Sequence, residues 1–246
     1  MKLNTWTVGK GKRTAALVHG ATKAADVWRD VARILAEQYD MTVILLDQRG
    51  HGRSPRANSY KVADFTGDLL ESLPTGLDYL MGASLGGVAS AWASAKLKPR
   101  RYIGFDPAFS LPAAAGVNSF VLGLLGPLEA SAVRGLFRMA GPQKLGPTAT
   151  PDTQEREKAM FKAWDASMMS QLVPSARQRP FPIAKPIVPS TLLLADKSVC
   201  VPEPMAIELR KLGWDVRVKP GAVHDLHFQD PPGVVKMLDD VLRAKA

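Results

Sequence analysis

Short apolar runs alternate with stretches of helical spacing along most of the chain. The runs at 14–18 (TAALV), 41–46 (MTVILL), 77–81 (LDYLM) and 102–105 (YIGF) each have the length of one buried strand. Between them, apolar residues recur three or four positions apart. Strands joined through helices form parallel neighbours. We therefore predict an α/β fold, a mostly parallel, doubly wound sheet with helices on both faces. Helices are expected at 26–38, 62–73 and 84–97.

The same alternation resumes near the end of the chain. Apolar runs at 191–195 (TLLLA) and 216–218 flank a helical stretch at 203–212. A last helix is expected at 233–244, where apolar residues again follow helical spacing.

The segment 111–190 has a different character. It is rich in Ala, Gly, Pro, Leu and Met, contains no convincing buried strand, and has helical spacing at 119–139 and 154–172. We predict a helical cap here, inserted into a core made of 1–110 and 191–246. The competing interpretation is a linker with irregular loops.

Composition excludes several function classes. The net charge is +9, but the basic residues are scattered and no aromatic residues interleave with them, so no nucleic-acid partner is expected. No run of eighteen apolar residues and no signal-peptide core is present, so no membrane partner is expected. Cys200 is the only cysteine, which fits a reducing, cytoplasmic location. No oligomeric state is predicted.

A candidate nucleophile lies directly after the run at 77–81. Gly82-Ala-Ser84-Leu-Gly86 fits the pattern G-x-S-x-G between a strand and a helix. A sharp turn there exposes the serine hydroxyl, and the amides at the start of the helix favour the negative charge of an acyl-transfer intermediate. The alternative is an ordinary strand-to-helix turn with an N-cap serine.

Three motifs together resemble those of the α/β-hydrolase family. They are Leu-Val-His-Gly at 17–20, Asp-Gln-Arg-Gly-His-Gly-Arg-Ser at 47–54 and Met-Gly-Ala-Ser-Leu-Gly-Gly at 81–87. The resemblance covers essentially the whole sequence and implies a serine esterase or lactonase with a cap. One departure is that only thirteen residues precede the first clear strand, so we expect the family's N-terminal strands to be shortened or merged.

Two backbone N–H groups are expected to form an oxyanion hole. The fold supplies one from Leu85, the residue after the nucleophile. The resemblance implies that the second comes from Ala21, after His-Gly. Thr22 is a candidate substrate contact through its hydroxyl, or else a turn residue.

Four histidines compete for the role of general base. His224 follows the last predicted strand, where the family's base lies, and His227 is its rival. His19 and His51 lie in turns where structural roles are expected. The pair His224 and His227 lacks the context of a zinc motif, so no metal and no other cofactor is predicted.

Two aspartates compete to orient the base. Asp196 ends the run at 191–195 and is preferred, because the order Ser84, Asp196, His224 is the order of the fold. Asp106 ends the preceding strand and is the alternative, since the resemblance includes members that carry the acid there.

The expected reaction is attack by Ser84 on a small-molecule ester, followed by hydrolysis of the acyl-enzyme. Lactones and thioesters fit the same scheme. The alternatives are a carbon–carbon bond hydrolase, a cofactor-free peroxidase and a ligand receptor without turnover. Predicted residues of an apolar substrate pocket, or alternatively of the cap core, are Trp164, Met168, Met169, Phe120, Leu124 and Phe137.

Overall fold

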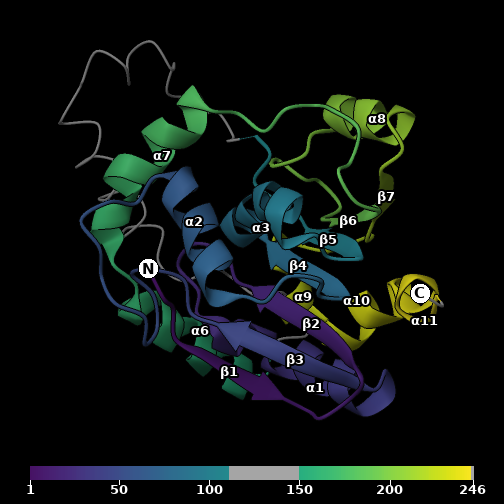
Figure 1. Cartoon of the computed structure of the whole chain (residues 1–246), viewed down its shortest axis with the longest axis horizontal. Helices are drawn as coiled ribbons and strands as arrows, with labels where there is room; N and C mark the ends of the chain where they lie inside the picture. Colours follow the sequence, from purple (N-terminus) through teal and green to yellow (C-terminus); the bar gives the residue numbers. More distant parts are fainter. Residues whose placement is uncertain (111–149, 245–246) are drawn as a thin grey trace.

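A computed structural model describes residues 1–110 and 150–244 of the chain. The strands in this part form one seven-stranded sheet in the order β1-β3-β2-β4-β5-β6-β7 (Figure 1). Every neighbouring pair is parallel except β1 with β3, which confirms the predicted mostly parallel sheet. The strands are β1 Thr5–Val8, β2 Arg13–Val18, β3 Met41–Leu46, β4 Tyr79–Ala83, β5 Arg101–Phe105, β6 Ser190–Leu194 and β7 Asp215–Val218.

Helices cover both faces of this sheet, as expected for a doubly wound fold. On one face lie α2 (Val62–Ser72), α3 (Ser84–Leu97) and α8 (Glu203–Lys211). On the other lie the 3₁₀ helix η1 (Ala25–Trp28), α1 (Arg29–Gln38), α9 (Leu226–Gln229), α10 (Pro231–Met237) and α11 (Asp239–Arg243).

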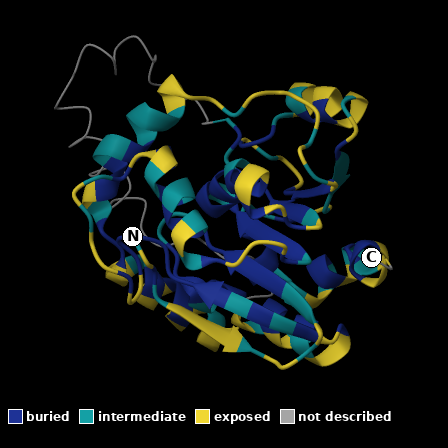
Figure 2. Ribbon diagram, viewed as in Figure 1, coloured by how far each residue is buried: buried dark blue, intermediate teal, exposed yellow. Residues whose placement is uncertain are grey.

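The strands bury side chains on both faces of the sheet. In β2, Ala16 and Val18 join the core beneath α2 and α3, whereas Ala15 and Leu17 join the core beneath α1. This alternation follows from the two-residue period of a strand. Burial on both faces explains why these strands are continuous apolar runs in the sequence. Figure 2 shows the central strands of the sheet as buried and the edge strand β1 as largely exposed.

Elements near both ends of the chain differ from expectation. The N-terminal part contributes β1, whose first three residues are exposed, so it has no apolar run to reveal it. The short helix α9 was not predicted either. The last helix is divided into α10 and α11 at Leu238.

Part of the predicted cap is described. Helix α6 (Pro151–Ala163), the 3₁₀ helix η2 (Ala166–Met168) and α7 (Met169–Gln178) replace the single helix expected at 154–172. The helix expected at 119–139 lies outside the described residues, as do Phe120, Leu124 and Phe137. The cap as a unit therefore stays a prediction.

The described cap helices reach both faces of the sheet. Met160 of α6 joins the core on the α1 side, whereas Met168, Met169 and Leu172 join the core on the α2 side. Between them the backbone N–H of Asp165 donates to the carbonyl oxygen of Gly50, just after β3. No helix in the described residues has the length and hydropathy needed to cross a bilayer.

Candidate active site

The carboxyl ends of three adjacent strands bring the predicted site residues to one edge of the sheet. Gly20 follows β2, Ser84 follows β4 and Asp106 follows β5. The register pairs Val18 with Gly82, and Ala83 with Phe105, so these turns lie side by side. Ligand sites of open α/β sheets form at this edge.

Ser84 occupies a strained turn between β4 and α3. Its φ of 50° is in the left-handed region, which a serine adopts at a cost. The side chain is half-buried. Close packing explains the following glycine, because a Cβ at Gly86 would overlap the carbonyl oxygen of His19. The local geometry is therefore that of a nucleophile elbow.

The loop after β2 lies against this elbow. A Cβ at Gly20 would stand only 3.0 Å from the Cβ of Ser84. His19 is fully buried and shapes the loop: its Nε2 accepts from the backbone N–H of Gln48 at 2.9 Å, and burial lowers its pKa to about 4. The neutral ring fits the structural role expected for His19. Ala21 directly follows Gly20 and Leu85 directly follows Ser84, and the role of their amides as oxyanion donors stays a prediction.

His224 is bound to Asp106. Its Nδ1 lies 2.6 Å from Oδ2 of this carboxylate. Asp106 is 1% exposed, and its Oδ1 also accepts a long hydrogen bond of 3.4 Å from the N–H of Ala195. Burial lowers the pKa of His224, but the hydrogen bond to Asp106 and the charges of Asp225 and Asp106 outweigh burial, so the pKa is raised overall.

The preferred acid of the sequence analysis requires correction. Asp196 is exposed, and within the described residues no hydrogen bond or ion pair reaches its carboxylate. Its backbone N–H donates to the carbonyl oxygen of Ala222 at 3.1 Å, in the loop after β7 that carries His224 (the base loop). The carboxylate beside His224 is that of the alternative, Asp106.

The other histidines are buried. His227, the rival base, stacks on Trp28 with ring centroids 3.9 Å apart, and neither ring nitrogen has a hydrogen-bond partner in the described part of the chain. Burial lowers its pKa to about 4. His51 packs edge-on against His19, and burial lowers its pKa to about 3. Of the four rings, His224 is therefore the one that combines a carboxylate at Nδ1 with a raised pKa.

Cys200 lies close to this pair. Ligand atoms of Cys200, Asp106 and His224 all lie within 4.8 Å of one another. Burial raises the pKa of the thiol to about 12, and His224 Nδ1 is hydrogen-bonded to Asp106. The geometry thus describes a hydrogen-bonded pair beside a protonated thiol.

The predicted pocket residues pack as core. Trp164 is 6% exposed and Met168 is fully buried, both within the apolar cluster on the α2 side. This arrangement agrees with their alternative interpretation as cap core. Thr22 is half-buried in the loop after β2, with a φ of 66° that fits a turn residue. Substrate contacts by all three residues stay predictions.

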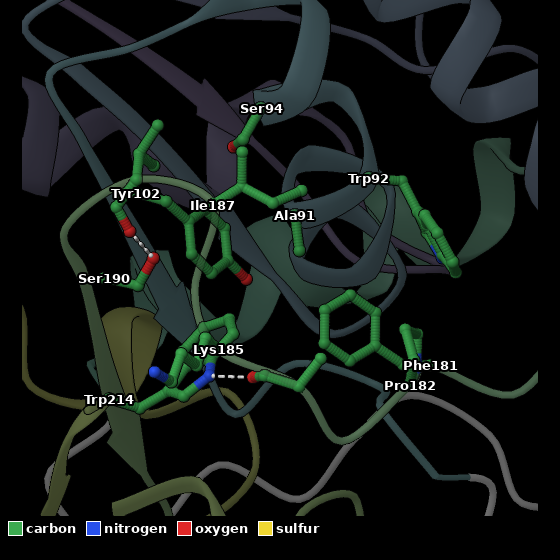
Figure 3. Close-up of a pocket in the computed structure, with 12 residues that line it drawn as sticks. Ala91, Trp92, Ser94, Tyr102, Phe181, Pro182, Lys185, Ile187, Ser190 and Trp214 are labelled. Atoms are coloured by element: carbon green, nitrogen blue, oxygen red, sulfur yellow. Dashed lines mark hydrogen bonds between the residues drawn. The ribbon is translucent and has the colours of Figure 1, made fainter. Parts of the chain in front are cut away.

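A separate apolar pocket lies at the opposite edge of the sheet (Figure 3). Ser190 and Trp214, at the amino ends of β6 and β7, border it, and Trp214 Nε1 donates to the carbonyl oxygen of Ala184 at 2.8 Å. None of the residues Ser84, Asp106 and His224 lines it. It is therefore distinct from the candidate active site.

One buried cluster near the base escaped the sequence analysis. Lys23 Nζ lies 2.5 Å from Glu157 Oε1 and 3.1 Å from Asp225 Oδ2. The three residues are far apart in the sequence, so no spacing connects them. Each charged residue read alone is typical of a solvated surface.

The seven-stranded, mostly parallel sheet with helices on both faces is the fold of the α/β hydrolases. The chain belongs to the alpha/beta hydrolase family, whose model matches residues 16–237. The seven-stranded sheet order and the Ser84 elbow agree with that membership.

Among curated proteins, the chain is similar to a pimeloyl-[acyl-carrier protein] methyl ester esterase from Edwardsiella ictaluri. They share 35% identity over 122 residues, which is 47% of this chain and 46% of the relative. The chain thus matches about half of the length of this relative.

Solved structures resemble the whole chain. A thermophilic esterase from Thermogutta terrifontis has a TM-score of 0.75 at 19% identity, covering 98% of this chain and 93% of that one. A hydrolase from Oleispira antarctica has a TM-score of 0.79 at 16% identity, covering 99% and 96%. An enol-lactonase from Burkholderia xenovorans has a TM-score of 0.69 at 17% identity, covering 98% and 96%. At these identities the likeness establishes the fold.

Proposed function

We propose that the chain is a serine hydrolase that cleaves a carboxylic ester through an acyl-enzyme on Ser84. The observation that carries the proposal is the 2.6 Å contact between His224 Nδ1 and Asp106. This contact lies at the same sheet edge as the Ser84 turn. In the proposed site, His224 is oriented by this buried carboxylate and serves as the base for the strained serine.

In this mechanism His224 donates Nδ1–H to Asp106 and keeps Nε2 unprotonated for Ser84. Ser84 Oγ attacks the ester carbonyl while Nε2 takes its proton, and the protonated ring then gives that proton to the leaving alcohol. A water activated by the same nitrogen hydrolyses the acyl-enzyme. The backbone N–H groups of Leu85 and Ala21 stabilise the tetrahedral oxyanion.

Several observations favour ester hydrolysis over the alternatives. The Edwardsiella relative is a methyl ester esterase, and the structural neighbours include esterases and an enol-lactonase. We therefore place esters first, and lactones and thioesters next, for a small to medium apolar substrate. Carbon–carbon bond hydrolysis and a receptor without turnover remain the competing functions.

Labelling with a fluorophosphonate, together with turnover of short p-nitrophenyl esters, tests the proposal. We expect the adduct on Ser84 and sustained turnover, with both lost in Ser84→Ala. Ser90→Ala is the matched control, because Ser90 lies in the same helix but is fully buried. Label without turnover of any ester would favour a receptor. Turnover that survives Ser84→Ala would refute the mechanism.

A further inference from the structure

A buried ionic cluster lies directly beside the proposed base. Lys23, Glu157 and Asp225 are each between 2% and 3% exposed, and one ammonium faces two carboxylates. The three groups come from the loop after β2, from helix α6 and from the loop that carries His224. Asp225 is also the next residue after His224 in the chain.

Such a cluster is costly as a source of stability alone. Removing two carboxylates and an ammonium from water carries a desolvation penalty of several kcal/mol per ion, which apolar residues would avoid. We therefore expect the buried charges to act on a neighbouring group. Burial raises the pKa of Asp225, but Lys23 and then His224 outweigh burial, so that the pKa is lowered overall and the carboxylate is ionised at neutral pH.

We infer that Asp225 is a positioning residue for His224, and that buried Lys23 fixes the Asp225 carboxylate, ionised, next to the base while linking the base loop to helix α6. The inference rests on the proposed function in so far as it takes His224 to be the base. The effect of the Asp225 carboxylate on the His224 ring does not depend on any substrate.

The charged groups around His224 determine the expected effect. Asp225 and Asp106 both favour the protonated ring, whereas Lys23 opposes it. The Cys200 thiol is protonated, and the nearby His227 ring is neutral, with its pKa lowered to about 4 by burial. Asp225 therefore adds to Asp106 in stabilising the imidazolium that forms when His224 takes the proton of Ser84.

NMR titration of the histidine rings in the full chain provides the test. His19, His51 and His227 are buried with pKa values lowered to about 4, 3 and 4, whereas the pKa of His224 is raised, so His224 is expected to titrate at the highest pH of the four rings. In Asp225→Asn, which keeps the shape of the side chain, we expect the pKa of His224 to fall. Glu157→Gln is the matched control, because it removes the other carboxylate on Lys23, and it should leave the pKa of His224 unchanged.

The double variant Lys23→Met/Asp225→Asn removes both charges of one ion pair and guards against misfolding of the single variant. The pKa of His224 should fall there too, but by less, because Lys23 and Asp225 act in opposite directions. An unchanged pKa in Asp225→Asn, or equal falls in Asp225→Asn and Glu157→Gln, would overturn the inference.

Ester kinetics separate this inference from the proposed function. His224 acts as a base in its neutral form, so a lower pKa keeps kcat/KM high down to a lower pH. In Asp225→Asn, the acidic limb of the kcat/KM–pH profile should therefore move to lower pH by the same amount as the pKa of His224 measured by NMR. A shift in NMR with no turnover in the wild type would refute the hydrolase while supporting the inference. Turnover in the wild type, with no change in Asp225→Asn of either the pKa of His224 or the acidic limb of the kcat/KM–pH profile, would support the hydrolase and refute the inference.

Discussion

The turns after β5 and β6 look alike in sequence but differ in the structure. The two strands are parallel neighbours, and each is followed by an aspartate at the same sheet edge, Asp106 directly and Asp196 after one residue. Asp106 is buried with its carboxylate on His224, whereas Asp196 is exposed. Placement at the right edge is therefore not sufficient, because burial and the direction of the turn decide which carboxylate reaches the base.

The local backbone explains the difference. Asp106 has a φ of 42°, a left-handed conformation that aspartate tolerates better than most residues. The turn after β6 supports this acid instead of supplying one, because the N–H of Ala195 donates to Asp106 Oδ1. The two turns thus form one unit with a single buried carboxylate.

Replacing each aspartate by asparagine should reveal the largest difference between the two turns, in kcat. We expect Asp106→Asn to lower kcat by about 10⁴-fold, because the amide no longer holds the required tautomer of His224. Asp196→Asn should change kcat by less than about twofold, because this residue is exposed and no side chain in the described part of the chain pairs with it. Steady-state kinetics on a p-nitrophenyl ester at pH 8 measure both. If Asp196→Asn proved the more damaging, Asp196 would return as the acid.

The reactivity of Cys200 provides a second measure of how closed the turn after β6 is. Burial raises the pKa of this thiol from the ordinary 9.0 to about 12, so its thiolate fraction at pH 8 falls by about 10³-fold. We expect alkylation by iodoacetamide to be slower by at least that factor in the native chain than in urea, as followed by mass spectrometry. Rapid native labelling would mean that this loop opens in solution.

The features that the sequence predicted well are those set by local patterns. The strand β3 and the helix α3 have the predicted bounds, because a continuous apolar run and a glycine-flanked serine turn are local signals. The strand β1 was missed because an exposed edge strand has no apolar run. The position of the acid was missed for another reason: Asp106 and Asp196 have equivalent sequence contexts, and only tertiary packing distinguishes them.

The Lys23 cluster illustrates the same limit more strongly. Its members come from three elements separated by more than sixty residues at each step, and each pairs only after the chain has folded. Periodicity and motif spacing report contacts along one element. They do not indicate which lysine becomes buried and forms ion pairs with two carboxylates that are distant in the sequence.

The pH dependence of kcat/KM should also distinguish the two aspartates. Despite burial, the carboxylates of Asp106 and Asp225 raise the pKa of His224 above 6.5. Because the base must be neutral, kcat/KM should fall as the pH decreases through a value above 6.5. Asp196→Asn should leave this acidic limb in place, since an exposed carboxylate is screened. A limb that moved in Asp196→Asn would mean that its charge acts on the base.

Equilibrium unfolding in urea should give the smallest difference between the two turns. Asp106→Asn replaces a buried, charge-assisted hydrogen bond by a weaker neutral one, so we expect a loss of about 1.5–3 kcal/mol in the free energy of unfolding. Asp196→Asn should stay within about 0.5 kcal/mol of the wild type, as is usual for surface substitutions. Equal losses in the two variants would show that Asp196 makes a stabilising contact in solution. The distinction between a buried acid and an exposed one would then fail on stability, whatever the two variants do to the rate.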